Sequence, residues 1–210
     1  MRHRSLLIAG MSGSPRPGKN TEVLLKESLR GAEEEGVETT LIRLADYRIE
    51  PCSGCGTCLK GKPCPIDERD DMPKLAEAIL GAQGVIICAP SYWGAVPGIL
   101  KNFMDRTRPL KMAGNKLAGK VLAAMAVAGL RCGGGEFVVD SILRFGLAHG
   151  MIIVGNLGDP TSSPCMVVSS LQGEKGWRRA VDDEMALSWA RELGARVGRV
   201  VKALASAGLL

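Results

Sequence analysis

Four cysteines crowd into thirteen positions of this sequence, with the spacing C-x2-C-x2-C-x5-C and a proline directly after the last. They are Cys52, Cys55, Cys58 and Cys64. Cysteines at such short successive intervals wrap one compact object, which is the arrangement found around a cubane iron–sulfur cluster. Gly54, Gly56 and Gly61 allow the backbone to turn tightly around it. Zinc ribbons usually use two C-x2-C pairs separated by a longer stretch, so zinc and a redox-active pair of thiols are the alternatives.

The composition agrees with redox chemistry inside a cell. The chain has 210 residues and seven cysteines, which are grouped rather than spread out as in a secreted disulfide framework. We therefore expect a cytoplasmic protein. The net charge of +5 is mild and aromatic residues make up only 4%, so nothing argues for nucleic-acid binding. No apolar run approaches the ~20 residues of a membrane span, and no membrane partner is expected.

A polar segment follows the first apolar run and precedes a helical pattern. Its side-chain donors are Ser12, Ser14, Arg16, Lys19, Asn20 and Thr21. Backbone N–H groups at the start of a helix bind anions, and the helix dipole assists them. The segment nearly matches the pattern G-x-x-x-x-G-K-[ST], but Asn20 replaces the hydroxyl that binds magnesium. A monophosphate needs no magnesium, so FMN is favoured over a nucleoside triphosphate. The alternative is an ordinary turn with Asn20 as the helix N-cap.

Two later loops carry residues that suit a flat aromatic ligand. The residues are Pro90, Tyr92, Trp93, Gly94, Gly129 and Arg131. The first loop places two of the few large aromatic side chains next to each other, and such side chains suit the edge of a flavin ring. The second is rich in glycine, so a ligand can approach its backbone closely, and its arginine would offset negative charge on a reduced flavin. The alternatives are an aromatic pair that only covers the sheet edge and a flexible surface turn.

Apolar runs alternate with helical patterns along the chain. Strands are expected over residues 5–11, 37–44, 84–89, 120–128 and 151–154, and helices over 20–36, 72–80, 97–107, 136–149 and 182–204. Five apolar strands separated by helices predict a parallel α/β sheet that is covered on both faces. Ligands in such folds lie beyond the carboxyl ends of the strands. The three loops described above all fall at that edge.

Two long connections interrupt the alternation. Residues 45–71 hold the cysteines, and residues 155–180 form a second connection for which we expect contact between subunits. Nothing marks a domain boundary, so residues 1–210 are expected to form a single domain. Cys88 lies in an apolar run and is expected in the core. His149 ends a helix, where the dipole favours its protonated form, and it is not expected to be catalytic.

In this order, the three loops resemble those of the NADPH-dependent FMN reductase family of flavodoxin-like proteins. The shared features are the Gly-Ser-Pro-Arg segment with its Asn-Thr, the Pro-x-Tyr-Trp-Gly segment, and the glycine-rich loop ahead of His149-Gly150-Met151. The resemblance spans about residues 4–155. It implies a flavodoxin-like, doubly wound, five-stranded parallel sheet with an inserted cysteine-rich loop. It also implies FMN bound without a covalent link, and a homodimer or homotetramer.

The cysteine motif narrows the resemblance to the iron–sulfur flavoproteins of anaerobic microbes. In that group four cysteines hold a [4Fe–4S] cluster, and Cys52, Cys55, Cys58 and Cys64 match them one by one. The implied function is an oxidoreductase that passes electrons between a reduced donor, ferredoxin or NAD(P)H, and an acceptor. The cofactors carry the chemistry, so no catalytic side chain is expected. The cluster is expected to face the FMN of a neighbouring subunit.

Two other functions remain open from the sequence. One is an NAD(P)H-dependent FMN or quinone reductase that holds no cluster and whose cysteines are incidental. The other is a redox-sensing module that binds flavin without turning over.

Overall fold

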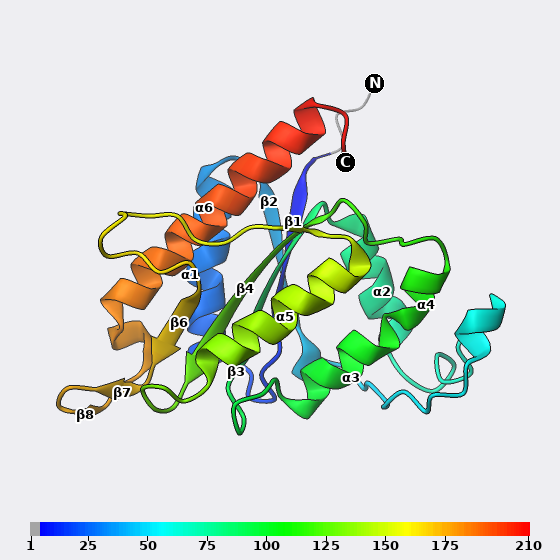
Figure 1. Cartoon of the computed structure of the whole chain (residues 1–210), viewed down its shortest axis with the longest axis horizontal. Coiled ribbons are helices and arrows are strands. Elements are labelled where there is room, and N and C mark those ends of the chain that lie inside the picture. The colour runs from blue at the N-terminus through cyan, green and yellow to red at the C-terminus, as the bar shows by residue number, and fades with distance from the viewer. Residues whose placement is uncertain (1–4) are drawn as a thin grey trace.

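A parallel β-sheet runs through the centre of the molecule in the computed structural model, which describes residues 5–210 (Figure 1). Its strands are β1 (Leu7–Ser12), β2 (Glu38–Arg43), β3 (Gly84–Pro90), β4 (Val121–Ala128) and β5 (Ile152–Ile153). They lie in the order β2-β1-β3-β4-β5, and every neighbouring pair is parallel. The five-stranded, doubly wound sheet predicted from the sequence is confirmed.

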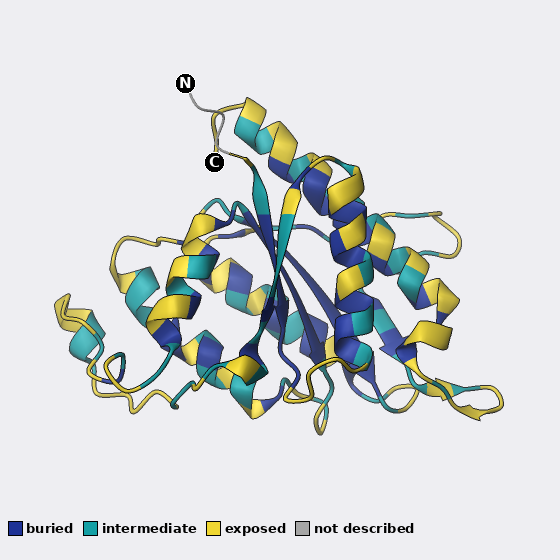
Figure 2. Ribbon diagram, turned by 180° about the vertical axis from the view of Figure 1, so that it is seen from behind, coloured by how far each residue is buried: buried dark blue, intermediate teal, exposed yellow. Residues whose placement is uncertain are grey.

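Helices cover both faces of this sheet. One face carries α1 (Asn20–Glu34) and α6 (Glu184–Ser206), and the other carries α2 (Met72–Gly81), α3 (Gly98–Arg106) and α5 (Gly135–His149). Figure 2 shows the strands as a buried layer between helices that expose their outer faces. Because both faces are covered, β3 and β4 are apolar and buried along almost their whole length.

The two helices on the first face approach each other very closely. A Cβ atom at Gly31 would lie 2.0 Å from the Arg191 carbonyl oxygen, and one at Gly194 would lie 1.7 Å from the Ser28 carbonyl oxygen. Only glycine fits at these two positions. An ion pair of 2.5 Å between Arg191 and Glu27 adds to the contact. The long C-terminal helix therefore fixes α1, whose first turn belongs to the predicted phosphate site.

The outer edge of β4 is completed by two strands rather than one. β5 pairs with Val121 and Leu122 at the start of β4, and β6 (Val167–Ser170) pairs with residues 125–128 at its end. β6 is also parallel to β4. The fifth position of the sheet is therefore filled by two separate segments of the chain, first β5 and then β6.

The sequence assigns residues 155–180 to a connection without strands, and the structure corrects this. The segment contains β6 and then a small antiparallel hairpin of β7 (Gln172–Gly173) and β8 (Gly176–Trp177). The glycines and prolines of residues 155–164 hide the return to the sheet, because they do not continue a strand. Val167 then becomes fully buried against β4.

The remaining helices of residues 5–210 are short. They are α4 (Arg108–Met112) and the 3-10 turns η1 (Leu44–Asp46), η2 (Thr57–Lys60) and η3 (Ala180–Asp182). η2 lies inside the long cysteine-containing connection, where the sequence predicts an insertion. No helix in residues 5–210 is long and apolar enough to cross a membrane.

Candidate functional site

The loop between β1 and α1 is held in shape by its own hydrogen bonds. The Gly13 N–H donates to the Cys88 carbonyl oxygen at 2.8 Å, and the Arg16 N–H donates to the Ser14 hydroxyl at 3.1 Å. Gly18 has a φ of +71°, which favours glycine because it has no Cβ. In the first turn of α1 the Glu22 N–H donates to the Lys19 carbonyl oxygen at 2.9 Å, whereas the N–H groups of Asn20 and Thr21 have no partner within the helix and remain available to an anion.

Glu22 is the buried support of this loop. Its carboxylate accepts the Gly18 N–H at 2.7 Å and the Arg43 Nε–H at 2.9 Å. Burial raises the pKa of Glu22, but the hydrogen bonds from Arg43 and Gly18 outweigh it and hold the pKa below its usual value. The carboxylate is therefore charged near neutral pH, and it ties the loop to the end of β2.

A cavity of about 280 Å³ opens beyond the carboxyl ends of β1, β3 and β4, and we call it the strand-end cavity. It is lined by Ser14, Arg16, Lys19, Asn20, Thr21, Pro90, Ser91, Tyr92, Val127, Gly129, Leu171 and Trp177. The residues near the start of α1 supply hydroxyls, an amide and two positive charges. The opposite wall supplies two aromatic rings and aliphatic side chains. This combination suits a ligand with an anionic end and a flat, largely apolar end.

Seven of the residues predicted to bind the cofactor come together here. They are Ser14, Arg16, Asn20, Thr21, Pro90, Tyr92 and Gly129. The other four lie outside the cavity wall. Ser12 is buried within β1, while Trp93 is fully exposed with a φ of +55°. Gly94 and Arg131 belong to loops beside the cavity but do not line it. Their cofactor-binding roles stay predictions.

The cavity has one wall that sequence reasoning missed. Leu171 and Trp177 come from the segment around the β7–β8 hairpin, and the Trp177 ring would lie 3.5 Å from a Cβ at Gly129. The Asn20 side-chain carbonyl accepts the Ala180 N–H at 3.1 Å, which joins this wall to α1. The available signal was Trp177 itself, one of the three tryptophans of the sequence, which directly follows Gly176.

Hydrogen bonds and close packing fix the two later loops against each other. The Ser91 hydroxyl donates to the Gly133 carbonyl oxygen at 2.6 Å. A Cβ at Gly134, whose φ is +79°, would lie 2.5 Å from the Gly94 Cα. The Arg131 N–H donates to the Gln172 side chain at 3.0 Å. The loops after β3 and β4 and the hairpin therefore form one connected rim.

All four predicted cluster cysteines line a second cavity, which we call the cysteine cavity. Gly54, Gly56 and Gly61 have φ values of +68°, +72° and +67°, so the backbone uses glycine to turn around it. Cys52 and Cys55 are exposed, while Cys58 and Cys64 are half-buried. The cavity wall is completed by residues of α3 and α4, among them Arg106 and Arg108.

The chemistry of the cysteine cavity favours thiolates. The Cys55 sulfur lies 3.1 Å from the Thr57 hydroxyl. Hydrogen bonds from the Thr57 hydroxyl and then from its backbone N–H lower the pKa of Cys55. Arg106 lies behind the segment and adds a buried positive charge. Thiolates are the form that binds metals and iron–sulfur clusters.

Four cysteine side chains can hold either a single metal ion or an iron–sulfur cluster, and their arrangement distinguishes the two. No three His, Cys, Asp or Glu side chains within residues 5–210 lie close enough together to hold a single metal ion. A cubane instead spreads its four cysteine ligands around a cage, and the C-x2-C-x2-C spacing suits that. The cysteine cavity encloses only about 20 Å³, so the side chains must spread outward to admit a cage. Their position at the surface allows this, and the donor set fits a cluster.

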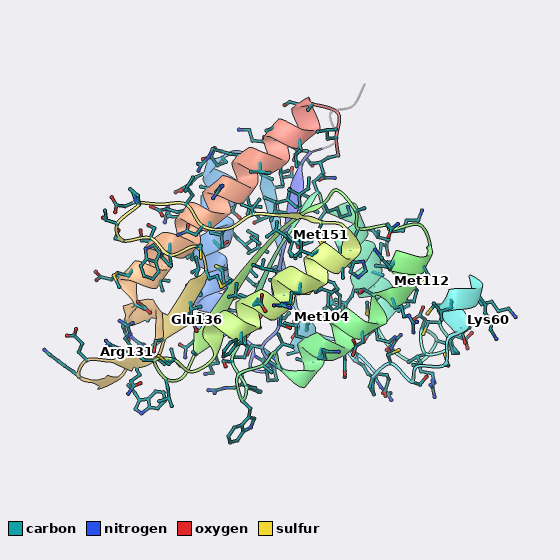
Figure 3. All side chains as sticks on the ribbon, viewed as in Figure 1. Lys60, Met104, Met112, Arg131, Glu136 and Met151 are labelled. Carbon is teal, nitrogen blue, oxygen red and sulfur yellow. The ribbon has the colours of Figure 1, made fainter. Side chains whose placement is uncertain are left out.

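The two cavities are lined by separate sets of residues. Figure 3 shows Lys60, which belongs to the cysteine segment, at one end of the molecule, and Arg131, beside the strand-end cavity, near the other. The long axis of the molecule is horizontal in this view, so the separation is a real distance rather than an effect of projection.

Two other residues considered in the sequence analysis, Cys88 and His149, are buried in the structure. Cys88 is fully buried in β3 as expected, and burial raises the pKa of its thiol. His149 is only 6% exposed, and its Nε2 lies 2.9 Å from the Thr107 hydroxyl. Burial, and then the charge of Lys111, lower the pKa of His149. The expectation that the helix dipole favours the protonated ring is therefore wrong, because burial outweighs the dipole.

Comparison with known proteins decides the family. The sequence profile of the NADPH-dependent FMN reductase family matches residues 6–158, which include the loops after β1, β3 and β4 and the cysteine segment but not the β7–β8 hairpin. The chain belongs to this family. It is therefore a member of a family of flavin-dependent oxidoreductases, and the resemblance drawn from the three loops is confirmed.

Individual relatives support the resemblance to iron–sulfur flavoproteins. An iron–sulfur flavoprotein of Methanocaldococcus jannaschii is 41% identical over 199 residues, covering 93% of this chain and 97% of the relative. An iron–sulfur flavoprotein of Archaeoglobus fulgidus is 34% identical over 196 residues, covering 93% and 96%. This FMN reductase family member is thus a homologue of iron–sulfur flavoproteins over nearly its full length.

The fold is shared with more distant solved structures. A flavodoxin, WrbA-like protein from Agrobacterium tumefaciens superposes with a TM-score of 0.61 at 16% sequence identity, covering 95% of this chain and 99% of the other. At that identity the likeness shows the flavodoxin-like fold alone.

Proposed function

We propose that this protein binds FMN in the strand-end cavity and a [4Fe–4S] cluster at Cys52, Cys55, Cys58 and Cys64, and passes electrons between a reduced donor and an acceptor. The observation that carries the proposal is that all four cysteines line one cavity, in a chain that is homologous to iron–sulfur flavoproteins over most of its length. Seven of the eleven residues predicted in the phosphate and ring loops come together around the other cavity.

In this proposal the start of α1 holds the phosphate of FMN. Ser14, Asn20 and Thr21 supply hydrogen-bond donors, and Arg16 and Lys19 supply positive charge. The buried Glu22 keeps the loop in the required shape without reaching the cavity wall. This arrangement needs no magnesium, in keeping with an FMN phosphate.

The ring of FMN lies against the opposite wall of the strand-end cavity. Tyr92 and Trp177 provide flat apolar surface, and Gly129 lets the ring approach the backbone. The neighbouring residues Trp93 and Arg131 are exposed at the rim, where they can contact a ring edge or an incoming partner. Flat aromatic side chains with polar tips suit this task.

Flavins exchange two electrons as hydride or one at a time and clusters exchange one, so the pair converts between the two kinds of donor. This chain's residues bind and orient the groups, and none is required to transfer a proton. We propose ferredoxin or NAD(P)H as the donor. Because the two cavities share no lining residue, we also propose a homodimer or homotetramer in which the cysteine segment of one copy faces the strand-end cavity of another.

An anaerobic preparation tests the proposal directly. The full chain, reconstituted with ferrous iron and sulfide, is expected to bind about four irons and one FMN and to show broad absorbance beside the flavin bands. A sample that binds FMN but takes up no iron after reconstitution would contradict the cluster. Size-exclusion chromatography with light scattering then checks the oligomer, and a loaded monomer with rapid transfer between cluster and flavin would contradict the arrangement between subunits.

One observation favours a second function, an NAD(P)H-dependent FMN or quinone reductase without a cluster. The cysteine cavity encloses little space, and two of its cysteines are exposed. Steady-state reduction of quinone by NADPH, undiminished in Cys52→Ser, would support this function. The same assay with no reduction by any nicotinamide or ferredoxin, despite bound FMN, would instead support a redox-sensing module.

A further inference from the structure

Arg106 ends α3 and is 2% exposed. Its Nη1 donates to the Glu50 carbonyl oxygen at 3.0 Å and to the Asp70 carboxylate, and its Nη2 donates to Asp67 at 2.6 Å and to Asp70 at 3.2 Å. Glu50 lies just before the first cysteine of the cluster motif, and Asp67 and Asp70 lie just after the last. One guanidinium group therefore joins both flanks of the cysteine segment to α3.

The fifth donor of Arg106 is unused. A guanidinium carries five N–H groups, and the buried Nε–H of Arg106 has no hydrogen-bond partner among residues 5–210. A buried donor without a partner is unfavourable, so such a group calls for an explanation. Arg106 is also part of the wall of the cysteine cavity.

The charged groups that act on Arg106 include Cys64, one of the predicted cluster ligands. Burial lowers the pKa of Arg106, but the hydrogen bonds that it donates to Asp70 and Asp67 raise the pKa further than burial lowers it, and the charge of a Cys64 thiolate adds to the rise. The side chain is thus a permanent cation next to one of the four thiolates. Arg108 also lines the cavity, but it is half-buried and forms no ion pair within residues 5–210.

We propose that Arg106 is a positioning residue for the iron–sulfur cluster. Four of its N–H groups clamp the two flanks of the cysteine segment, and the fifth donates a hydrogen bond to a sulfur of the loaded site. The inference rests on the proposed [4Fe–4S] site and adds to it a named residue that shapes the site and tunes it.

Two physical consequences follow. Hydrogen bonds to cluster sulfurs and nearby positive charge raise the reduction potential of an iron–sulfur cluster. Lysine cannot replace Arg106, because a single ammonium group cannot bridge both flanks and still reach the cage. Both the fit of the cysteine segment and the potential therefore depend on this one side chain.

The direct experiment detects the hydrogen bond in the unaltered protein. The full chain is labelled with ¹⁵N-arginine, reconstituted anaerobically with ferrous iron and sulfide, and reduced, and the paramagnetic cluster is examined by pulsed EPR. We expect coupling to an arginine nitrogen that is lost in Arg106→Lys and kept in Arg108→Lys. Full iron content without arginine coupling, or coupling that survives in Arg106→Lys, would overturn the proposal.

A redox titration measures how Arg106 changes the reduction potential of the cluster. At a fixed solution potential, the ratio of reduced to oxidised cluster is expected to fall about tenfold in Arg106→Gln, equal to ~59 mV for one electron, and to fall by less in Arg108→Gln, whose half-buried charge is better screened by water. Unchanged iron content with an unchanged ratio would overturn the proposal. Loss of iron from Arg106→Gln, with FMN binding and melting temperature unchanged, would support the clamp.

The two proposals can fail separately. If the unaltered chain takes up no iron, both the cluster and the role of Arg106 are wrong. If it takes up iron but shows no arginine coupling, only the role of Arg106 is wrong. Should Arg106→Gln fail to fold, the labelled unaltered protein still decides the question.

Discussion

The strand-end cavity is bounded by three strand ends and the start of a helix, whereas the cysteine cavity is bounded by a surface loop. The sheet hydrogen bonds and the packing of α1 on α6 place the first before any ligand binds. The second depends on Arg106, whose side chain holds the two flanks of the loop. A parallel sheet thus supplies one site as a property of the fold, while the other is added to it and must be held by side chains.

The largest difference between the two cavities is expected when one cysteine thiolate is removed. Cys64→Ser is expected to lower iron binding strongly, because one of the four thiolate ligands is lost, while FMN binding in the other cavity stays unchanged. Iron and flavin counts after anaerobic reconstitution check this. Cys165→Ser, which changes an exposed cysteine outside both cavities, is the matched control and is expected to load normally. Loss of FMN from Cys64→Ser would show that the two sites are not independent.

The strand-end cavity is tested by changing its buried support. Glu22→Gln is expected to lower the free energy of unfolding by about 1–3 kcal/mol, because the charged acceptor of Arg43 and Gly18 is lost. FMN affinity should fall with it, while iron uptake stays intact. Chemical denaturation and flavin titration measure the two effects. Glu33→Gln, on the same helix with its side chain exposed, should cost less than Glu22→Gln; an equal loss would contradict the role given to Glu22.

A smaller effect on FMN binding is expected from the wall of the strand-end cavity that the β7–β8 hairpin forms. Trp177→Ala is expected to weaken FMN binding up to about tenfold, since ring contacts contribute about 0.5–1.5 kcal/mol beyond the area they bury. Trp93→Ala is the control, because Trp93 is fully exposed and does not line the cavity. Flavin fluorescence titration separates them. A larger loss in Trp93→Ala would return Trp93 to the role predicted from the sequence.

The smallest effect concerns acid stability near the cysteine cavity. The pKa of His149 is lowered in the folded state, so the unfolded chain binds the proton more readily and stability falls as pH drops below about 6.5. The ring contacts Thr107, between the two helices that wall the cysteine cavity. Melting temperatures at pH 5.5 and 7.5 should differ less in His149→Gln than in the unaltered chain. An equal difference would exclude His149 as a cause.

Sequence alone predicts the sheet and the loops at its edge, because apolar runs and helical periods are local patterns. Ser14, Thr21 and Tyr92 could be placed together for the same reason, since the carboxyl ends of parallel strands meet at one edge. Trp177 could not, because β6 returns to β4 from a segment with no strand pattern of its own. Arg106 is similar: in an amphipathic helix an arginine is normally expected at the surface, and its partners Asp67 and Asp70 lie more than thirty residues earlier.

The shared edge of β4 has a consequence for how this chain can vary. β5 and β6 occupy separate halves of one strand, so the stretch between them, residues 154–166, carries no part of either cavity wall. Val154 and Asn156 within it are buried and hydrogen-bonded, whereas residues 159–162 form an exposed stretch, so length changes confined to residues 159–162 leave both strand pairings in place. That stretch is consequently where an affinity tag or a reporter domain can be inserted into the middle of the chain while both cofactor sites keep their shape.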